Sequence, residues 1–342
     1  MSTRGVRVER EVTDEERTLL RAMATDAAID DRTKKKALAV LTFLETKDLS
    51  AASERSNLSI RTISKTIHLF DEDGWRSLIT IQSPRGGDFL SHYDQGFWAE
   101  RLVRVYLNKS RDYRAIPYGT SRSEPFTDLQ TFRDHAVNEF LLQAWSSGRR
   151  WKRPDLLLVA RQMLQQEAGN DSWTPDLIHW DNKQCAPFVA RAAAAIEVET
   201  SLWEVTRSRV PLSFTVKEED LEGLCSWASA NDVPLYICQV FYDEAHVLAF
   251  SRLEFLIGSD APPDKRVTAE VDRTTRKATY KIPLTEGVRL GHIPEPNVEG
   301  RVYKAPNGKV TVYGRLTGSF IEAQDRNTLE LLASGRLEGK NE

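Results

Sequence analysis

Three acidic residues stand beside or within segments whose pattern is typical of β-strands. Asp155 directly precedes the apolar run 156–159, and Glu197 and Glu199 alternate with apolar residues in the segment 195–200. A short apolar run is typical of a buried strand, and strict alternation places both glutamates on one face of the second strand. Mg2+ prefers oxygen ligands and completes its coordination with water and substrate phosphate. The pattern therefore predicts a magnesium site for phosphodiester hydrolysis.

We expect these three residues to have different roles in the hydrolysis. Asp155 and Glu197 are the predicted metal ligands. A bound Mg2+ would polarise the scissile phosphate and lower the pKa of the attacking water. Glu199 is predicted to be a further metal ligand, or the group that positions or deprotonates that water.

The first metal ligand has an alternative. Asp176 also follows a proline and lies closer in sequence to Glu197 than Asp155 does. Spacing alone does not decide between them. We favour Asp155 because its apolar strand is uninterrupted and its approach, residues 149–153, is basic. Glu139 is a possible auxiliary carboxylate, although a solvated helix face is its more ordinary interpretation.

The surrounding pattern predicts the elements that position these carboxylates. With Asp155 as the first ligand, residues 187–194 are expected to form an inserted helix. Residues 212–217 and 233–241 are expected to be strands, and the apolar spacing over 221–228 predicts an amphipathic helix between them. A strand, helix and strand in this order predict a βαβ unit that lays the helix against the sheet carrying the carboxylates.

These segments together resemble the PD-(D/E)xK nuclease superfamily, and more narrowly type II restriction endonucleases of the AccI group. The resemblance implies a restriction-endonuclease-like core, a central mixed sheet flanked by helices, and Mg2+-dependent cleavage of double-stranded DNA. The family usually ends its second half-motif with lysine, where this chain has Glu199, although some restriction enzymes use glutamate there. Lys217 is a candidate substitute if its strand lies beside that of Glu197, although an exposed structural lysine is its more ordinary interpretation. The resemblance is carried by Pro154-Asp155, Glu197-Val198-Glu199, Phe214–Leu221 with Trp227, Val233-Pro234 and Gln239-Val240-Phe241.

A second motif lies near the start of the chain. Asp48 is predicted to cap a short helix over 49–55, and Ser59 is predicted to cap the next helix. In that second helix Ile60, Ile63, Ile67 and Phe70 form one apolar stripe. The segment resembles the helix-turn-helix of transposases and bacterial regulators, in which early residues of the second helix meet base edges. A plain helical bundle is the alternative. The residues that this resemblance turns toward DNA are Arg61, Thr62, Ser64 and Lys65.

Composition narrows the class of protein. The formal net charge is -3, yet lysine and arginine gather in short runs such as 32–36 and 149–153, so local basic surfaces remain possible. No long apolar run is present, which predicts neither a membrane span nor a secretory signal, and hence a cytoplasmic protein. Three scattered cysteines are expected to be buried free thiols, and the scattered histidines predict no histidine-based metal site.

We therefore expect a mixed α/β (α+β) protein in three parts. Residues 1–82 are predicted to form the helical DNA-binding domain, 88–258 the nuclease core, and 259–342 a β-rich extension with hairpins near 285–287 and 307–308. The leading hypothesis is a sequence-specific endonuclease that acts as a homodimer on double-stranded DNA. The alternatives are a non-catalytic helix-turn-helix regulator and a transposase-like enzyme.

Overall fold

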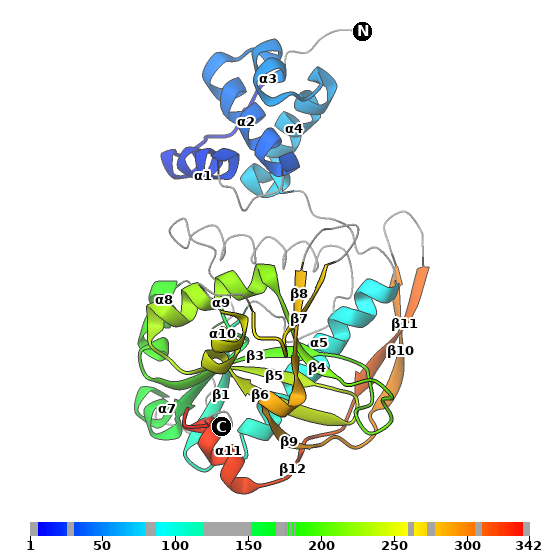
Figure 1. The fold of residues 1–342 in the computed structure, drawn as a ribbon. Helices are drawn as coiled ribbons and strands as arrows, with labels where there is room; N and C mark the ends of the chain where they lie inside the picture. The colour runs from blue at the N-terminus through cyan, green and yellow to red at the C-terminus, as the bar shows by residue number, and fades with distance from the viewer. Residues whose placement is uncertain are drawn as a thin grey trace. The chain divides into compact units, whose positions relative to one another are not determined.

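The structure is a computed structural model that divides into two compact units. One unit comprises Met1–Ser83 with Phe132–Gly148, and the other comprises Pro84–Thr131 with Arg149–Glu342. Figure 1 shows the helices of the first and the sheets of the second. The predicted division into three domains stays a prediction. The residues that the structure describes are 6–25, 31–79, 87–119, 152–168, 175, 177, 180, 182–258, 263–271, 278–304 and 310–337.

The described part of the first unit is helical, and its second helix is the centre of two buried clusters. One face of that helix packs Val40 and Leu44 against Leu20 of the first helix. Its other face packs Phe43 against Ile63 and the two helices that follow. The elements are α1 (Asp14–Thr25), α2 (Asp31–Thr46), α3 (Leu49–Ser56), α4 (Ile60–Asp73) and the 3-10 helix η1 (Gly74–Leu78).

The second unit is built on a seven-stranded mixed sheet with the order β1-β2-β3-β5-β6-β9-β12. Strands β3 and β5 pair in parallel, and the other neighbouring strands of this sheet pair antiparallel. Strand β3, which carries Glu197 and Glu199, therefore lies between β2 and β5. The strands are β1 (Tyr113–Pro117), β2 (Leu156–Ala160), β3 (Ala192–Thr200), β5 (Leu235–Val240), β6 (Glu244–Ala249), β9 (Val288–His292) and β12 (Glu322–Ala323).

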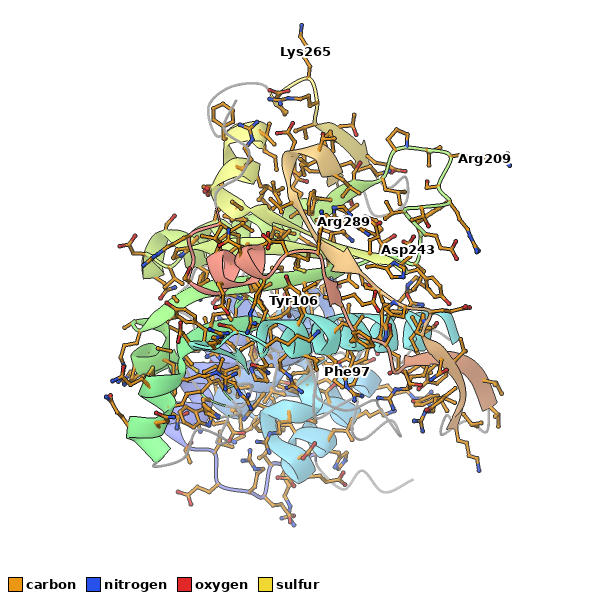
Figure 2. All side chains as sticks on the ribbon, turned by 90° about the horizontal axis from the view of Figure 1, so that it is seen from below. Phe97, Tyr106, Arg209, Asp243, Lys265 and Arg289 are labelled. Carbon is orange, nitrogen blue, oxygen red and sulfur yellow. The ribbon has the colours of Figure 1, made fainter. Side chains whose placement is uncertain are left out.

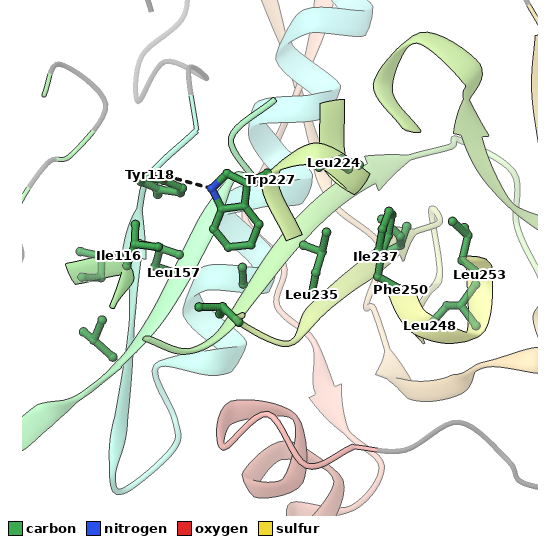
Figure 3. Close-up of a cluster of buried hydrophobic side chains, with 14 of the residues drawn as sticks. Ile116, Tyr118, Leu157, Leu224, Trp227, Leu235, Ile237, Leu248, Phe250 and Leu253 are labelled. Atoms are coloured by element: carbon green, nitrogen blue, oxygen red, sulfur yellow. Dashed lines mark hydrogen bonds between the residues drawn. The ribbon is translucent and has the colours of Figure 1, made fainter. Parts of the chain in front are cut away.

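Helices cover both faces of this sheet. On one face Leu224 and Trp227 pack over Leu157, Leu235 and Ile237, as Figure 3 shows. The opposite face packs against a long helix and a C-terminal helix. The fold is therefore mixed α+β with a mixed sheet between helical layers. The helices are α5 (Gly87–Leu107) and α11 (Arg326–Ala333) on one face, and α7 (Arg161–Ala168), α8 (Asn182–Val189), α9 (Glu218–Asn231) and α10 (Phe250–Ile257) on the other.

Two smaller sheets complete the second unit. Strands β4 (Ser213–Lys217), β8 (Ala278–Pro283) and β7 (Thr268–Val271) form one with the order β4-β8-β7. Strands β10 (Asn297–Lys304) and β11 (Val310–Thr317) form an antiparallel ribbon. Strands β9 and β12 from the C-terminal part of the chain pair into the seven-stranded sheet, so this part contributes to the central sheet itself.

The predicted βαβ unit is wrong in one respect. Strand β4, helix α9 and strand β5 form where expected, but β4 pairs with β8 in the smaller sheet while β5 pairs with β3 and β6. The parallel partner of β5 is β3, and the connection between these two strands contains both β4 and α9. Helix α9 nevertheless packs on the sheet that carries the glutamates.

Two local predictions are also corrected. The helix expected over 187–194 occurs earlier, as α8, and residues from Ala192 onward are a strand. Alanine favours helix, but here its pairing with the apolar strand β2 outweighs that intrinsic preference. The hairpin expected near 285–287 is a 3-10 helix, η3 (Leu284–Glu286), because β8 and β9 join different sheets. The second predicted turn, 307–308, lies outside the described residues.

The cysteines are free thiols, as predicted. Cys185 and Cys238 are buried, as expected, whereas Cys225 is only half-buried. Among the described helices, none has the length and apolar character needed to cross a membrane.

Candidate active site

Asp155 lies at the entrance to β2, and both its main chain and its side chain are held in place. Its carbonyl oxygen accepts hydrogen bonds from the N–H groups of Tyr118 and Gly119, at 2.9 and 3.1 Å. Its carboxylate Oδ2 accepts a hydrogen bond of 2.8 Å from the N–H of Val198 on β3. The side chain of Asp155 therefore bridges two neighbouring strands and lies next to the residue that precedes Val198, which is Glu197.

Glu197 is buried, with only 3% of its surface exposed. Its Oε1 atom is 2.5 Å from the ammonium of Lys152, whereas its Oε2 atom is buried without a hydrogen-bond partner. Burial raises the pKa of Glu197 to about 8, the negative charge of Asp155 adds to this rise, and Lys152 opposes it. A buried carboxylate with an unsatisfied oxygen is costly, so this atom is a natural position for a cation or a donor.

Glu199 lies two residues farther along β3 on the same face and is half-buried. Burial raises its pKa to about 7, Lys152 opposes this rise, and Glu197 adds to it. The prediction that both glutamates share one face holds, but that face is largely covered, because Ala195 and Ile237 beside them belong to a buried cluster. The two carboxylates are therefore in a partly dehydrated environment.

Lys152 is the cation of this site. Its ammonium is 3.1 Å from Asp220 Oδ1 of α9, in addition to its contact with Glu197. Burial alone would lower the pKa of Lys152, but the negative charges around it raise that pKa well above its usual value, so the ammonium stays charged. The carboxylates acting on it are Glu197, Asp220, Glu199 and Asp155, called here the carboxylate cluster.

The carboxylate cluster suits a hard divalent cation in its donor chemistry. Carboxylate oxygens are the ligands that Mg2+ prefers, and Mg2+ needs only one or two of them when water and phosphate supply the rest. The unsatisfied Oε2 of Glu197 beside Asp155 meets that requirement. A cage of three or more histidine, cysteine or acidic side chains arranged for a metal ion is absent from the described residues.

Helix α4 of the first unit carries the residues predicted to face DNA. Asp48 caps α3, Asn57 adopts a left-handed φ of 55° at its end, and Ser59 caps α4 by accepting a hydrogen bond from the N–H of Thr62. Arg61 and Lys65 are exposed. The helix, tight turn and helix predicted from the sequence are therefore present as predicted.

Other side chains of α4 differ in exposure from the predicted pattern. Thr62 and Ser64 are half-buried, and the hydroxyl of Thr62 lies 2.9 Å from that of Ser59. The predicted apolar stripe starts later than expected, because Ile60 is 49% exposed while Ile63 is buried. Ile60 is the first residue of α4 and lies beyond the cluster that its successors join.

No family model, curated protein or solved structure matches this chain.

The structure brings together some of the predicted site residues and not others. Asp155 lies beside Glu197, because its carboxylate accepts from the N–H of Val198, and Glu199 lies on the same face of β3 as Glu197. Lys217 does not lie on a strand beside β3, because β4 belongs to the smaller sheet, although its charge still lowers the pKa of Glu199. Asp176 and Glu139 fall outside the described residues.

Two residues of the site were missed by the sequence patterns. The sequence patterns place Lys152 only in a basic run, and Asp220 only in the block that carries the family resemblance. The position of Lys152 three residues before Asp155 was a local signal for the first. Asp220 lies in the first turn of α9, so its place in the site depends on how α9 packs on the sheet, which the local sequence does not show.

Proposed function

We propose that this protein is a Mg2+-dependent endonuclease of the PD-(D/E)xK type that hydrolyses double-stranded DNA. The observation that carries the proposal is the position of Asp155, whose carboxylate accepts from the N–H of Val198, next to the buried Glu197, whose Oε2 has no hydrogen-bond partner. Two carboxylates held in this way supply the oxygen ligands that Mg2+ requires.

The chain's own residues would carry the reaction as follows. Asp155 and Glu197 would hold Mg2+, which when bound supplies Lewis-acid stabilisation of the phosphate. Glu199, which lies on the same face of β3 as Glu197, would accept a proton from the attacking water. The water oxygen would form a bond to phosphorus, the bond to the leaving sugar oxygen would break, and that oxygen would take up a proton from solvent.

The architecture also supports this proposal, although the proposal does not depend on it. The family resemblance implies a mixed sheet flanked by helices, and the chain has such a sheet, with Asp155 directly before β2 and Glu197 on the adjacent strand β3. The absence of a preformed metal cage among the described residues does not oppose it, because Mg2+ relies on water and substrate phosphate for most of its ligands.

The first unit would hold the duplex. In the proposed complex α4 enters the major groove, with Arg61 and Lys65 as its exposed cations. Cutting both strands of a symmetric sequence favours a twofold homodimer, because each protomer then supplies one active site to one strand. A regulator that binds DNA without cutting it is the second candidate, and the helix-turn-helix geometry of α3 and α4 favours it equally.

Cleavage of long unmodified DNA distinguishes the two candidates. The full chain is incubated with phage genomic DNA in Mg2+, in Mn2+ and in EDTA, and the fragments are resolved on gels. We expect discrete fragments that require a divalent cation, and a loss of cutting of about 100-fold or more in Glu197→Gln, since a metal ligand contributes several kcal/mol to the transition state. Binding without cutting by the parent protein would favour the regulator, and undiminished cutting by Glu197→Gln would overturn the site.

A further inference from the structure

The second half-motif of this chain ends in an acid where the resembled family usually has a lysine. Glu199 occupies that position on β3, so this strand brings no positive charge to the carboxylate cluster. The carboxylate cluster nevertheless has a cation beside it. The ammonium of Lys152 lies 2.5 Å from Glu197 Oε1 and 3.1 Å from Asp220 Oδ1, and it approaches from the segment that leads into β2.

The backbone of Lys152 is seated against α9 at a glycine. The N–H of Lys152 donates to the carbonyl of Gly223 at 3.4 Å. A Cβ atom at Gly223 would lie 2.8 Å from the Cβ of Lys152 and 2.9 Å from its backbone nitrogen. Real Cβ atoms do not come this close to other atoms. Only glycine at this position allows the segment and the helix to come so close.

The next residue is anchored as well. The guanidinium of Arg153 lies over the ring of Tyr118, 5.1 Å from its centre, and Arg153 is buried. The hydroxyl of Tyr118 in turn accepts a hydrogen bond of 3.0 Å from Trp227 of α9, drawn as the dashed line in Figure 3. The segment that carries Lys152 is thus held to α9 directly at Gly223 and indirectly through Tyr118.

We infer that Lys152 supplies the positive charge that β3 lacks at position 199, and that Asp220 positions it. This inference rests on the proposed nuclease function. In the DNA complex the ammonium faces the scissile phosphate, where it offsets the negative charge that grows on the phosphoryl oxygens as the water oxygen bonds to phosphorus and the sugar oxygen leaves. Lys152 would then be a catalytic residue and Asp220 a positioning residue.

The other lysine near the cluster is a weaker candidate. Lys217 is exposed at the end of β4, in the smaller sheet, and its charge lowers the pKa of Glu199. The charges that change the pKa of Glu197 are those of Asp155, Lys152 and Asp220. Lys152 acts on both Glu197 and Glu199 and contacts Glu197 directly. The geometry therefore assigns the role to Lys152.

The test compares Lys152→Met, the conservative variant Lys152→Arg, and the matched control Lys183→Met, which replaces an exposed lysine on α8. Each is assayed for Mg2+-dependent cutting of phage DNA. We expect Lys152→Met to lose about 100-fold or more in rate, as for removal of one group that stabilises transition-state charge. Lys152→Arg should keep part of the parent's rate, because it retains a positive charge at this position, and Lys183→Met should cut as the parent does.

A second measurement separates catalysis from folding. Melting temperature is followed against Mg2+ concentration without DNA. The ammonium of Lys152 competes with a cation for Glu197, so in Lys152→Met the rise in melting temperature should occur at lower Mg2+ concentration. A purely structural lysine would lower the melting temperature without moving that midpoint.

The outcomes distinguish failure of this inference from failure of the proposed function. If the parent cuts DNA and Lys152→Met cuts equally well, the role of Lys152 is overturned and the nuclease stands. If Lys152→Met and Lys152→Arg lose activity equally and the Mg2+ midpoint stays in place, Lys152 is structural and the inference is overturned. A parent that neither cuts DNA nor is stabilised by Mg2+ removes both proposals.

Discussion

The carboxylate of Asp155 accepts a hydrogen bond from the backbone N–H of Val198, so the first acidic residue of the site is tied to the strand that carries the others. Val198 stands between Glu197 and Glu199 on β3. A buried backbone N–H that loses its partner is costly, so Asp155 contributes to the join between β2 and β3 as well as to the proposed chemistry. Substitutions of Asp155 can separate these two contributions.

Asp155→Asn should abolish cutting and largely preserve stability, because the amide oxygen still accepts from Val198 while the negative charge is lost. Asp155→Ala should abolish cutting and also lower the free energy of unfolding by about 1–3 kcal/mol, the cost of a buried donor left unpaired. Urea denaturation and the DNA-cutting assay measure the two effects. Equal stability of the asparagine and alanine variants would contradict the structural part of this prediction.

Gly119→Ala should disturb the site through the backbone. A Cβ at this position would lie 2.9 Å from Asp155 Cα and 3.1 Å from Asp155 Oδ1. We expect a loss of about 1–3 kcal/mol in stability, as for overpacking, together with reduced cutting. The matched control is Gly96→Ala in α5, where a Cβ meets nothing within 4 Å and alanine should stabilise the helix by about 1 kcal/mol. Thermal unfolding of both variants checks the pair, which should shift in opposite directions.

The proposed DNA contact of α4 predicts a particular salt dependence. Arg61→Ala and Lys65→Ala remove exposed cations from α4 and should each weaken binding to duplex DNA. If each side chain contacts one phosphate, the slope of log affinity against log salt should fall by about one unit per variant. Arg21→Ala on α1, also exposed, is the control. Fluorescence anisotropy at several salt concentrations gives the slopes, and identical slopes for all three variants would argue against α4 as the DNA-contacting helix.

Asp243, labelled in Figure 2, predicts a pH dependence of stability. Its carboxylate, just before β6, accepts hydrogen bonds from the N–H of Val205 at 2.7 Å and from the N–H and hydroxyl of Thr206 at 3.0 and 2.6 Å. Burial alone would raise the pKa of Asp243, but these hydrogen bonds outweigh it and hold the pKa below 3.8. The ionised form is thus the one that the folded state favours.

The sign of the effect follows from that lowered pKa. Asp243 contributes stability above its unfolded pKa of 3.8, and this contribution is lost as the pH falls through the lower folded value. At pH 7, Asp243→Ala should lower the free energy of unfolding by about 1–3 kcal/mol, as expected for hydrogen bonds to a charged group. The difference between parent and variant should shrink below pH 3.8. Urea denaturation over a pH series measures it, and a difference that stays constant down to the lowest pH would refute the assignment.

Much of the site's local geometry could be predicted from sequence. Alternation over 195–200 predicted a strand with Glu197 and Glu199 on one face, and the polar residues Asp48 and Ser59 predicted the starts of α3 and α4. Such features depend on backbone geometry and on nearest neighbours in the chain, so a few consecutive residues are enough to predict them. The sequence pattern could therefore determine which side chains share a face, and where helices begin.

Only the tertiary structure decided what those faces meet. The alternating pattern could not tell that helix α9 covers the face of Glu197, or that β4 leaves the main sheet and takes Lys217 away from β3. Nor could it bring Lys152 to Glu197, since that contact depends on Gly223, a residue far along the chain. Contacts of this kind arise from packing between segments that are distant in the chain. The periodicity of one segment does not show which other segment packs against it.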